Sequence, residues 1–323
     1  MRSFRTVLCI LGAFIGAGFA SGREVMRFFT QYGTLSVPLI LLTGCLISWV
    51  MRRALCGGIT SADMRLPEKA ILLLLFLAAG GGMTAAAGEL WALTIPLRHA
   101  RSMGMLLSLG CCMAASGKPE RAMTALGYLL LPVLLLALTL CMRTPASPEM
   151  PFPASGAWDA AQAVAGCFAY AGMNGMLALG IMEKAGRDCS RRRNCRCAVW
   201  AGGAVTALLL LCNRALLPHA AALRDEPLPL VVLLRVYGTE GYYLAAALLY
   251  LAVITTLIAV LRGMRDRTAR ILPRFSCLVT GLAVATVSLC GFERIVAVAY
   301  PVLGLLCFWL FAGKKRERRT AAL

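Results

Sequence analysis

Long apolar runs alternate with short polar segments along the whole chain. A membrane-spanning helix needs about 20 mostly apolar residues. This pattern predicts an all-α integral membrane protein with ten transmembrane helices. The ten expected spans are Thr6–Tyr32, Leu35–Leu55, Ala70–Leu93, Ser102–Ala115, Ala122–Met142, Trp158–Met182, Ala198–Leu217, Tyr242–Leu261, Ile271–Cys290 and Ile295–Ala312.

The first span contains its own interruption. Gly12, Gly16, Gly18 and Gly22 fall in its middle, and Ser21-Gly22-Arg23-Glu24 follows the capping-box pattern that marks the start of a helix. A helix start halfway across a membrane predicts two half-helices that meet at a break. Such breaks are tolerated only where the freed backbone groups line a cavity or bind something.

Two other interpretations of this stretch remain open. The spacings Gly12 to Gly16 and Gly18 to Gly22 are both G-x-x-x-G, a pattern also typical of close helix packing. The start of the chain is also similar to a signal peptide, with Arg2 and Arg5 before an apolar run and small residues near Ala20. The expected topology requires that this segment be retained.

The sixth span carries a comparable set of residues. Gly172, Asn174 and Gly175 interrupt an apolar run near its middle. Ten spans divide into two halves of five, and an odd number per half makes the second half inverted relative to the first. We therefore expect one transmembrane domain over 1–323, built as a 5+5 inverted repeat. The first repeat covers about 5–142, the second about 156–313, and a basic tail covers 314–323, with helices 1 and 6 both broken.

Charge fixes the expected orientation. The chain is 59% hydrophobic and 15% charged, and its net charge is +18. With the N-terminus inside, 24 Lys and Arg residues lie on the inner side and seven on the outer side. Basic residues collect in cytoplasmic loops. We therefore expect a multi-pass protein of the cell membrane with both termini in the cytoplasm. Its partners are the lipid bilayer and a small-molecule substrate, and no nucleic acid; the oligomeric state stays open.

A family resemblance adds to this picture. The block Gly16–Glu24 followed by Phe28-Phe29, with Tyr170 and Asn174 in the sixth span and Thr255-Thr256 in the eighth, resembles the YkvI-like family of bacterial membrane proteins. The resemblance implies a relationship to the amino acid–polyamine–organocation transporters and the leucine-transporter fold. It also implies a sodium site in which hydroxyls of the eighth helix and carbonyls of the first helix coordinate the ion.

The two expected breaks supply the candidate ligand groups. Free carbonyls from Ala13 to Ala17 suit a cation, and free N–H groups from Gly22 onward suit a carboxylate. The expected substrate-binding residues are Gly18, Ser21, Gly22, Glu24, Tyr170, Gly172 and Asn174. The expected sodium ligands are Ala13, Gly16, Thr255 and Thr256. Threonine in a membrane helix also commonly bonds the carbonyl one turn earlier, so that alternative stays open for the last two.

Several acidic and polar side chains have two interpretations. Glu24 is either the third residue of the capping box or an acid that carries a proton or contacts the substrate, with Arg27 as a local partner. Glu89 is either an interfacial acid, or part of an outer gate or a proton site. Gly80-Gly81-Gly82 either lets the third span pass close to the substrate or permits packing. Asn174 bonds either the substrate or its own backbone.

The function expected from these features is secondary transport. The solute is small, organic and amino-acid-like, and the coupling ion is sodium or a proton. The alternative is a ligand-sensing membrane subunit, similar to a germination permease, that carries no flux. No catalytic residues and no cofactor other than a possible Na⁺ are expected, since the sequence has only two histidines and no nucleophile or phosphate-binding motif. Cys189, Cys195 and Cys197 lie in a basic loop, but their spacing matches no standard zinc pattern.

Overall fold

The computed structural model describes residues 7, 10–12, 14–61, 64–116, 119–145, 157–187, 189–269 and 273–313. Every regular element in these ranges is helical, and none of them forms a strand. The tail 314–323 and the expected repeat boundary near 142–156 lie largely outside the described residues.

The α-helices of the described residues are, in chain order, α2 Ala17–Ala20, α3 Arg23–Phe28, α4 Ser36–Leu55, α5 Leu66–Thr94, α6 Ala100–Ala115, α7 Pro119–Cys141, α8 Ala157–Leu177, α9 Leu179–Arg187, α10 Arg191–Leu216, α11 Pro229–Leu234, α12 Gly238–Thr268, α13 Ser276–Ser288, α14 Phe292–Arg294 and α15 Tyr300–Gly313. Short 3₁₀ turns at Thr30–Leu35, Leu217–His219 and Arg235–Tyr237, and a π-helical turn at Ile295–Ala299, join neighbouring helices.

Length and apolar character make this a multi-pass membrane protein. Five described helical segments are long and apolar enough to cross a bilayer: Thr30–Leu55, Leu66–Thr94, Arg191–His219, Pro229–Thr268 and Phe292–Gly313. Helices α8 and α9 pass the same test only together, and they are bent by 60° at their junction, as in a broken span or a re-entrant loop. Ala100–Ala115, Tyr128–Cys141 and Ser276–Ser288 are apolar but shorter. The count of ten spans stays a prediction.

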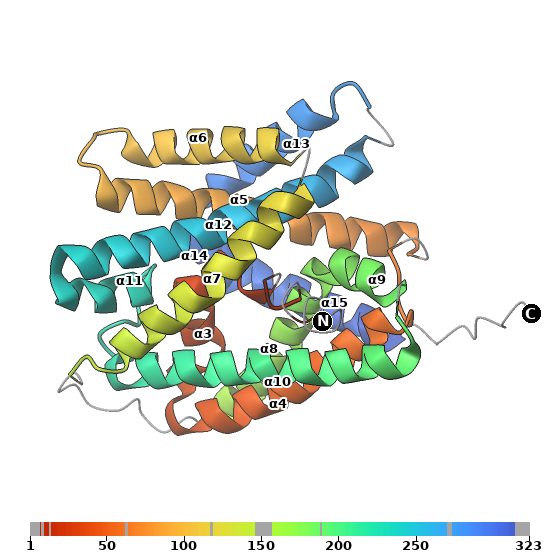
Figure 1. Cartoon of the computed structure of the whole chain (residues 1–323), viewed down its shortest axis with the longest axis horizontal. Helices are drawn as coiled ribbons and strands as arrows, with labels where there is room; N and C mark the ends of the chain where they lie inside the picture. Colours follow the sequence, from red (N-terminus) through yellow and green to blue (C-terminus); the bar gives the residue numbers. More distant parts are fainter. Residues whose placement is uncertain are drawn as a thin grey trace, which may run out of the picture.

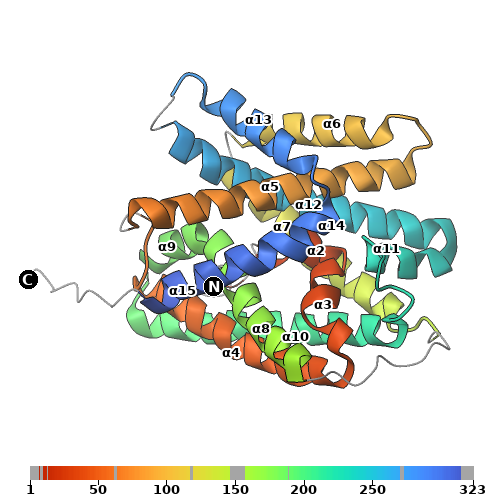
Figure 2. The ribbon, with the colours of Figure 1, turned by 180° about the vertical axis from the view of Figure 1, so that it is seen from behind.

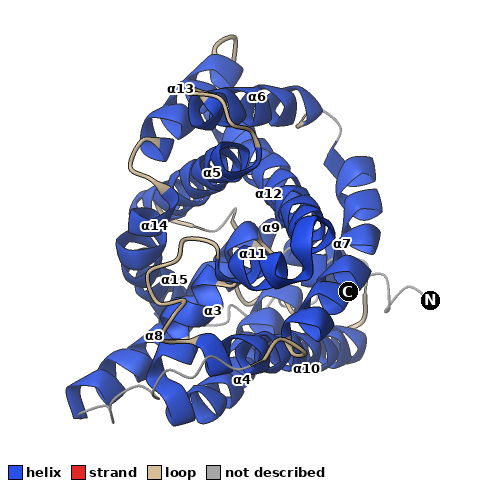
Figure 3. Cartoon of the chain, turned by 90° about the vertical axis from the view of Figure 1, so that its left-hand side faces the viewer, coloured by secondary structure: helices blue, strands red, loops and turns tan. Residues whose placement is uncertain are grey.

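The helices gather in two groups around a central segment. Figures 1 and 2 show α5, α6, α12 and α13 together on one side, and α4, α8 and α10 together on the other. Helix α7 crosses between the groups and contacts both α12 and α10. Helix α3 lies between the groups, where it contacts α8, α10 and the π-helical turn (Figure 3). The interrupted first segment is thus enclosed by the rest of the chain.

Several of the contacts between helices repeat when the two expected halves are exchanged. Helix α5 packs on α6, as α12 packs on α13. Helix α6 packs on α12, as α13 packs on α5. Likewise α7 packs on α12, as α15 packs on α5, and α4 packs on α8, as α10 packs on α3.

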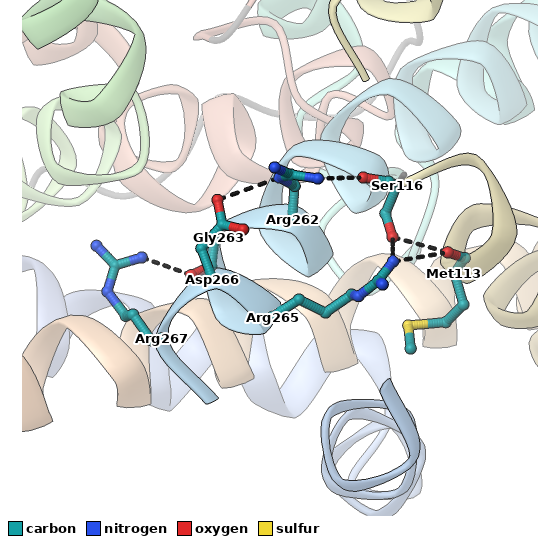
Figure 4. Close-up of polar contacts among 7 residues, drawn as sticks. All are labelled: Met113, Ser116, Arg262, Gly263, Arg265, Asp266 and Arg267. Carbon is teal, nitrogen blue, oxygen red and sulfur yellow. Dashed lines mark hydrogen bonds and ion pairs between the residues drawn. The ribbon is translucent and has the colours of Figure 1, made fainter. Parts of the chain in front are cut away.

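One end of α12 carries a cluster of arginines (Figure 4). Arg265 Nη1 donates to Ser116 Oγ at 2.7 Å and to the Met113 carbonyl at 3.5 Å, and Arg262 donates to the Ser116 carbonyl at 3.3 Å. Basic side chains near a helix C-terminus satisfy carbonyls that have no partner in their own helix. The hydrogen bonds of these arginines therefore hold the end of α6 against α12. Arg262 also pairs with Asp266, at 3.1 Å.

Candidate functional site

The first segment loses helical geometry twice in the region where the sequence predicts a break. Ile15 and Gly16 are non-helical, α2 runs for four residues, and the chain turns again at Ser21 and Gly22 before α3 begins. Gly22 has φ +80°, a left-handed conformation that glycine adopts without strain. The carbonyl of Ser21, freed by this turn, accepts a hydrogen bond from Leu230 N–H of α11 at 2.9 Å.

The expected capping box does not form. Ser21 Oγ accepts from the N–H of Arg23, two residues ahead, at 3.3 Å and donates to the Gly18 carbonyl at 3.0 Å. The residue directly before α3 is Gly22 in its left-handed conformation, and glycine has no side chain that could cap the helix. The extra turn at Gly22 moves Ser21 out of the capping position, so the helix starts near the expected place by a different mechanism.

Glu24 points back across the interruption instead. A Cβ added at Gly18 would overlap the Glu24 carboxyl group, so this carboxyl lies directly against the Gly18 backbone. Glu24 is only 4% exposed. The expected partner Arg27 is exposed and donates to Gln31, so the prediction of a Glu24–Arg27 pair is wrong. The two residues are one turn apart in α3, but the Glu24 carboxyl turns back to Gly18 while Arg27 reaches forward to Gln31.

Aromatic rings cluster at the end of α3. Tyr170 of α8 is fully buried, and its ring meets Phe28 and Phe29 edge-on with centroid distances of 5.4 and 5.3 Å. Tyr170 and Tyr300 both lie close enough to Glu24 for electrostatic interaction with its carboxyl group. The structure therefore brings Gly18, Ser21, Gly22, Glu24 and Tyr170 into one region.

Tyr300 is a residue of this region that the sequence did not reveal. It is 1% exposed, and its hydroxyl has no hydrogen-bond partner among the described residues. The hydroxyl lies 3.4 Å from the position that a Cβ of Gly82 would occupy. A π-helical turn, a feature frequent at functional sites, directly precedes it. The run Gly80–Gly82 gave the one sequence signal for this close approach.

Arg23 is a second residue that the sequence analysis did not single out. Its side chain is 9% exposed and pairs with Glu293 of α14 at 2.6 Å. It also donates to the carbonyls of Arg224 and Glu226 at 2.6 and 3.0 Å. Arg23 thus ties the start of α3 to α14 and to the loop before α11.

The sixth expected span is not broken where the sequence placed the break. Helix α8 is continuous through Gly172, Asn174 and Gly175, and the bend comes at Ala178. A Cβ at Gly172 would overlap the Gly304 carbonyl of α15, and a Cβ at Gly175 would overlap Val50 of α4. These glycines serve close helix packing, so the break predicted at Gly172, Asn174 and Gly175 is wrong.

Asn174 and Glu89 both have partners within the protein. Asn174 Nδ2 donates to the Tyr170 carbonyl, one turn earlier in its own helix, at 3.1 Å. Glu89 of α5 pairs with Arg101 of α6. Both side chains therefore have a protein partner in this conformation.

The expected sodium ligands are partly brought together. The Thr256 hydroxyl lies 3.5 Å from the position that a Cβ of Gly16 would occupy, beside the first interruption. Thr255 is buried and donates to the carbonyls of Leu251 and Ala252 in its own helix, at 3.0 and 2.9 Å. Ala13 lies outside the described residues. Within the part of the chain that is described, no group of three or more His, Cys, Asp or Glu residues is placed to hold a metal ion.

Comparisons with known proteins agree with this architecture. No family model matches the chain. It is 22% identical over 334 aligned residues to Uncharacterized protein YyaD of Bacillus subtilis (strain 168), covering 94% of this chain and 93% of that protein. Its structure is similar to the crystal structure of MhsT in complex with L-phenylalanine, with a TM-score of 0.55 and 16% identity over 95% of this chain and 88% of that one. The chain therefore shares the fold of MhsT.

Proposed function

We propose that this membrane protein is a secondary transporter of a small, amino-acid-like solute. The observation that carries the proposal is the interrupted first segment, which places the buried Glu24 carboxyl at the centre of the fold. MhsT, which shares that fold, was crystallised with L-phenylalanine. Transporters place their substrate and coupling ion at interrupted helices near the membrane midplane.

The proposed architecture is leucine-transporter-like, with ten spans in two inverted repeats. The helix contacts that persist when the halves are exchanged support this arrangement. The excess of inner-side Lys and Arg supports cytoplasmic termini in the cell membrane. The resemblance to the YkvI-like family stays part of the proposal.

The proposed solute region consists of Gly18, Ser21, Gly22, Glu24 and Tyr170, to which we add Tyr300. Glu24 either binds the ammonium group of the solute or carries a coupling proton. Tyr300 adds a buried hydroxyl that has no hydrogen-bond partner among the described residues. Gly172 and Asn174 contribute indirectly. Gly172 allows α8 to pack closely against α15, and the hydrogen bond of Asn174 within its own helix stabilises α8.

The proposed sodium site lies between the first segment and α12. Gly16 and Thr256 are its nearest pair, with Ala13 as an additional carbonyl and Thr255 as a neighbour already bonded in its own helix. Hydroxyl and carbonyl oxygens are the ligands that a hard cation prefers. A proton on Glu24 is the alternative coupling ion.

Flux across a bilayer tests this function. The purified protein is reconstituted into liposomes, and uptake of radiolabelled L-phenylalanine and of a panel of other amino acids is measured under an inward sodium or proton gradient. We expect gradient-dependent accumulation of at least one solute, absent from protein-free liposomes. If a solute raises the melting temperature but never accumulates, the protein senses its ligand and does not transport it. If no solute either binds or accumulates, the proposal fails.

A further inference from the structure

Two cysteines from different helices face each other at one end of the fold. Cys56 directly follows α4, and Cys195 lies in the second turn of α10. Their sulfur atoms are 3.8 Å apart, although the residues are 139 positions apart in the sequence. Both side chains are half-buried, so a small reagent can reach them.

Hydrogen bonds that do not involve the sulfur atoms hold the backbone beside this cysteine pair in place. Asn194, which precedes Cys195, is buried and donates from Nδ2 to the carbonyl of Leu55, which precedes Cys56, at 2.8 Å. The same amide donates to the Gly186 carbonyl at the end of α9, at 3.0 Å. A Cβ at Gly186 would overlap the Leu55 carbonyl, so three chain segments meet here at the closest approach that glycine allows.

This fixed register places the sulfurs close to bonding geometry. A disulfide bond has sulfurs about 2.0 Å apart. Closing the gap therefore needs roughly 2 Å of sulfur movement, which rotation about the side-chain torsions supplies without unfolding either helix. Two thiols held this way react with each other as neighbours, at an effective concentration that free thiols do not reach.

The charges around Cys56 act on its reactivity. Burial raises the pKa of the Cys56 thiol, and contact with Cys195 raises it further. Arg191 on α10 and Arg52 on α4 oppose that rise. The thiolate is the reactive form. Its fraction at neutral pH is therefore small and increases as the pH rises.

We propose that Cys56 and Cys195 form a redox modification site, oxidised to an intramolecular disulfide by a low-molecular-weight disulfide such as glutathione disulfide. One protein thiolate attacks a sulfur of the reagent, forms a mixed disulfide and releases one glutathione thiolate. The second protein thiol, once deprotonated, attacks the protein-side sulfur and releases the second glutathione thiolate. Two protein thiols are oxidised, one glutathione disulfide is reduced to two glutathione molecules, and the two protons pass to the released thiolates.

The new bond ties the end of α4 to the start of α10 covalently. Because Asn194 also holds the last turn of α9, the link fixes the point where the bent α8–α9 segment meets both helices. The inference rests on the contacts at this end of the fold and does not depend on which solute the protein carries.

Peptide mapping of the full chain tests the proposal. The purified protein in detergent is incubated with glutathione disulfide, free thiols are capped with N-ethylmaleimide, and the protein is digested without reductant. We expect a linked peptide that joins Cys56 to Cys195, absent after reduction, and formed faster as the pH rises. Recovery of both cysteines as maleimide or glutathione adducts, or a bond of either one to a different cysteine, overturns the proposal.

Serine variants provide the controls. Cys56→Ser and Cys195→Ser each leave one partner, so the remaining cysteine should carry a glutathione adduct instead of the cross-link. Cys45→Ser, in the same helix α4 but exposed, should leave the linked peptide unchanged. Loss of the linked peptide in Cys45→Ser would show that the pairing seen in the parent arises by exchange through other thiols, and would overturn the proposal. The melting temperature of each reduced variant verifies that it is folded.

Discussion

The first segment and α8 contain similar sets of small and polar residues, yet they behave differently. Between Ile15 and Gly22 the backbone leaves helical geometry twice, and Gly22 adopts a left-handed conformation. Helix α8 keeps its helical backbone through Gly172 and Gly175 and bends only at Ala178. Glycines alone do not break a membrane helix.

The difference lies in the partners of each segment. In the first segment, Leu230 N–H, the Ser21 hydroxyl and the Gly18 carbonyl take up the hydrogen bonds that the helix gives up. In α8, Asn174 donates back to its own helix, and Gly172 allows α15 to approach. A break therefore needs alternative hydrogen-bond partners as well as flexible residues, because unpaired backbone groups are costly in a membrane.

The largest expected effect is on the packing glycine of α8. In Gly172→Ala the new methyl group would overlap the Gly304 carbonyl, and backbone atoms cannot rotate away as a side chain does. We expect a loss of about 3 kcal/mol in the free energy of unfolding, at the upper end for overpacked sites. Thermal or denaturant unfolding of the purified protein measures it. The control is Gly203→Ala, where nothing lies within 4 Å; equal stability of the two variants would contradict the packing role.

The next effect concerns the turn of the first segment. Gly22→Ala places a side chain at φ +80°, which costs about 1–2 kcal/mol, and its Cβ would lie 3.0 Å from Leu230 Cγ. We expect lower stability and a weaker contact between α3 and α11, measured by thermal unfolding and by hydrogen exchange at Leu230. Gly12→Ala has open space and serves as the matched control. If Gly22→Ala is as stable as Gly12→Ala, the left-handed turn is not part of the native structure.

A smaller effect is expected on ligand binding. Glu24→Gln keeps the shape of the side chain beside Gly18 but removes its charge. A hydrogen bond to a charged group contributes about 1.5 kcal/mol or more, so the affinity for the amino acid that most raises the melting temperature should fall roughly tenfold. Glu89→Gln, which removes the partner of Arg101, is the control and should bind normally. Unchanged affinity in Glu24→Gln would show that this carboxyl does not bind the solute.

The smallest effect distinguishes the two threonines of α12. Thr256 faces Gly16, whereas Thr255 is bonded within its own helix. One neutral oxygen contributes about 0.5–1.5 kcal/mol, so Thr256→Val should weaken sodium-dependent uptake or binding roughly threefold while Thr255→Val changes it less. The assay replaces sodium with choline at fixed pH. Equal sodium response in Thr256→Val and the parent protein would remove the proposed sodium site.

The sequence predicted the helical class, most helix positions and the region of the first interruption. These features depend on local information, since the length of an apolar run and a cluster of glycines next to Ser21 act over a few residues. The same local reasoning failed at α8 and for the Glu24–Arg27 pair. There the outcome depends on what packs against the helix, and Gly304 and Phe308 lie more than 100 positions away in the sequence.

The sequence by itself thus determined that the chain spans a membrane several times, and that Glu24 lies in an interrupted helix. Only the tertiary structure decided where that carboxyl points, which glycines permit packing, and which distant residues join the region. Arg23 meets Glu293 across 270 positions, and the Tyr300 hydroxyl reaches Gly82 from another helix. A membrane helix that is buried all round is apolar on every side, so its sequence pattern does not show which side faces which neighbour. The choice of partners is therefore made by shape and hydrogen bonding once the helices assemble.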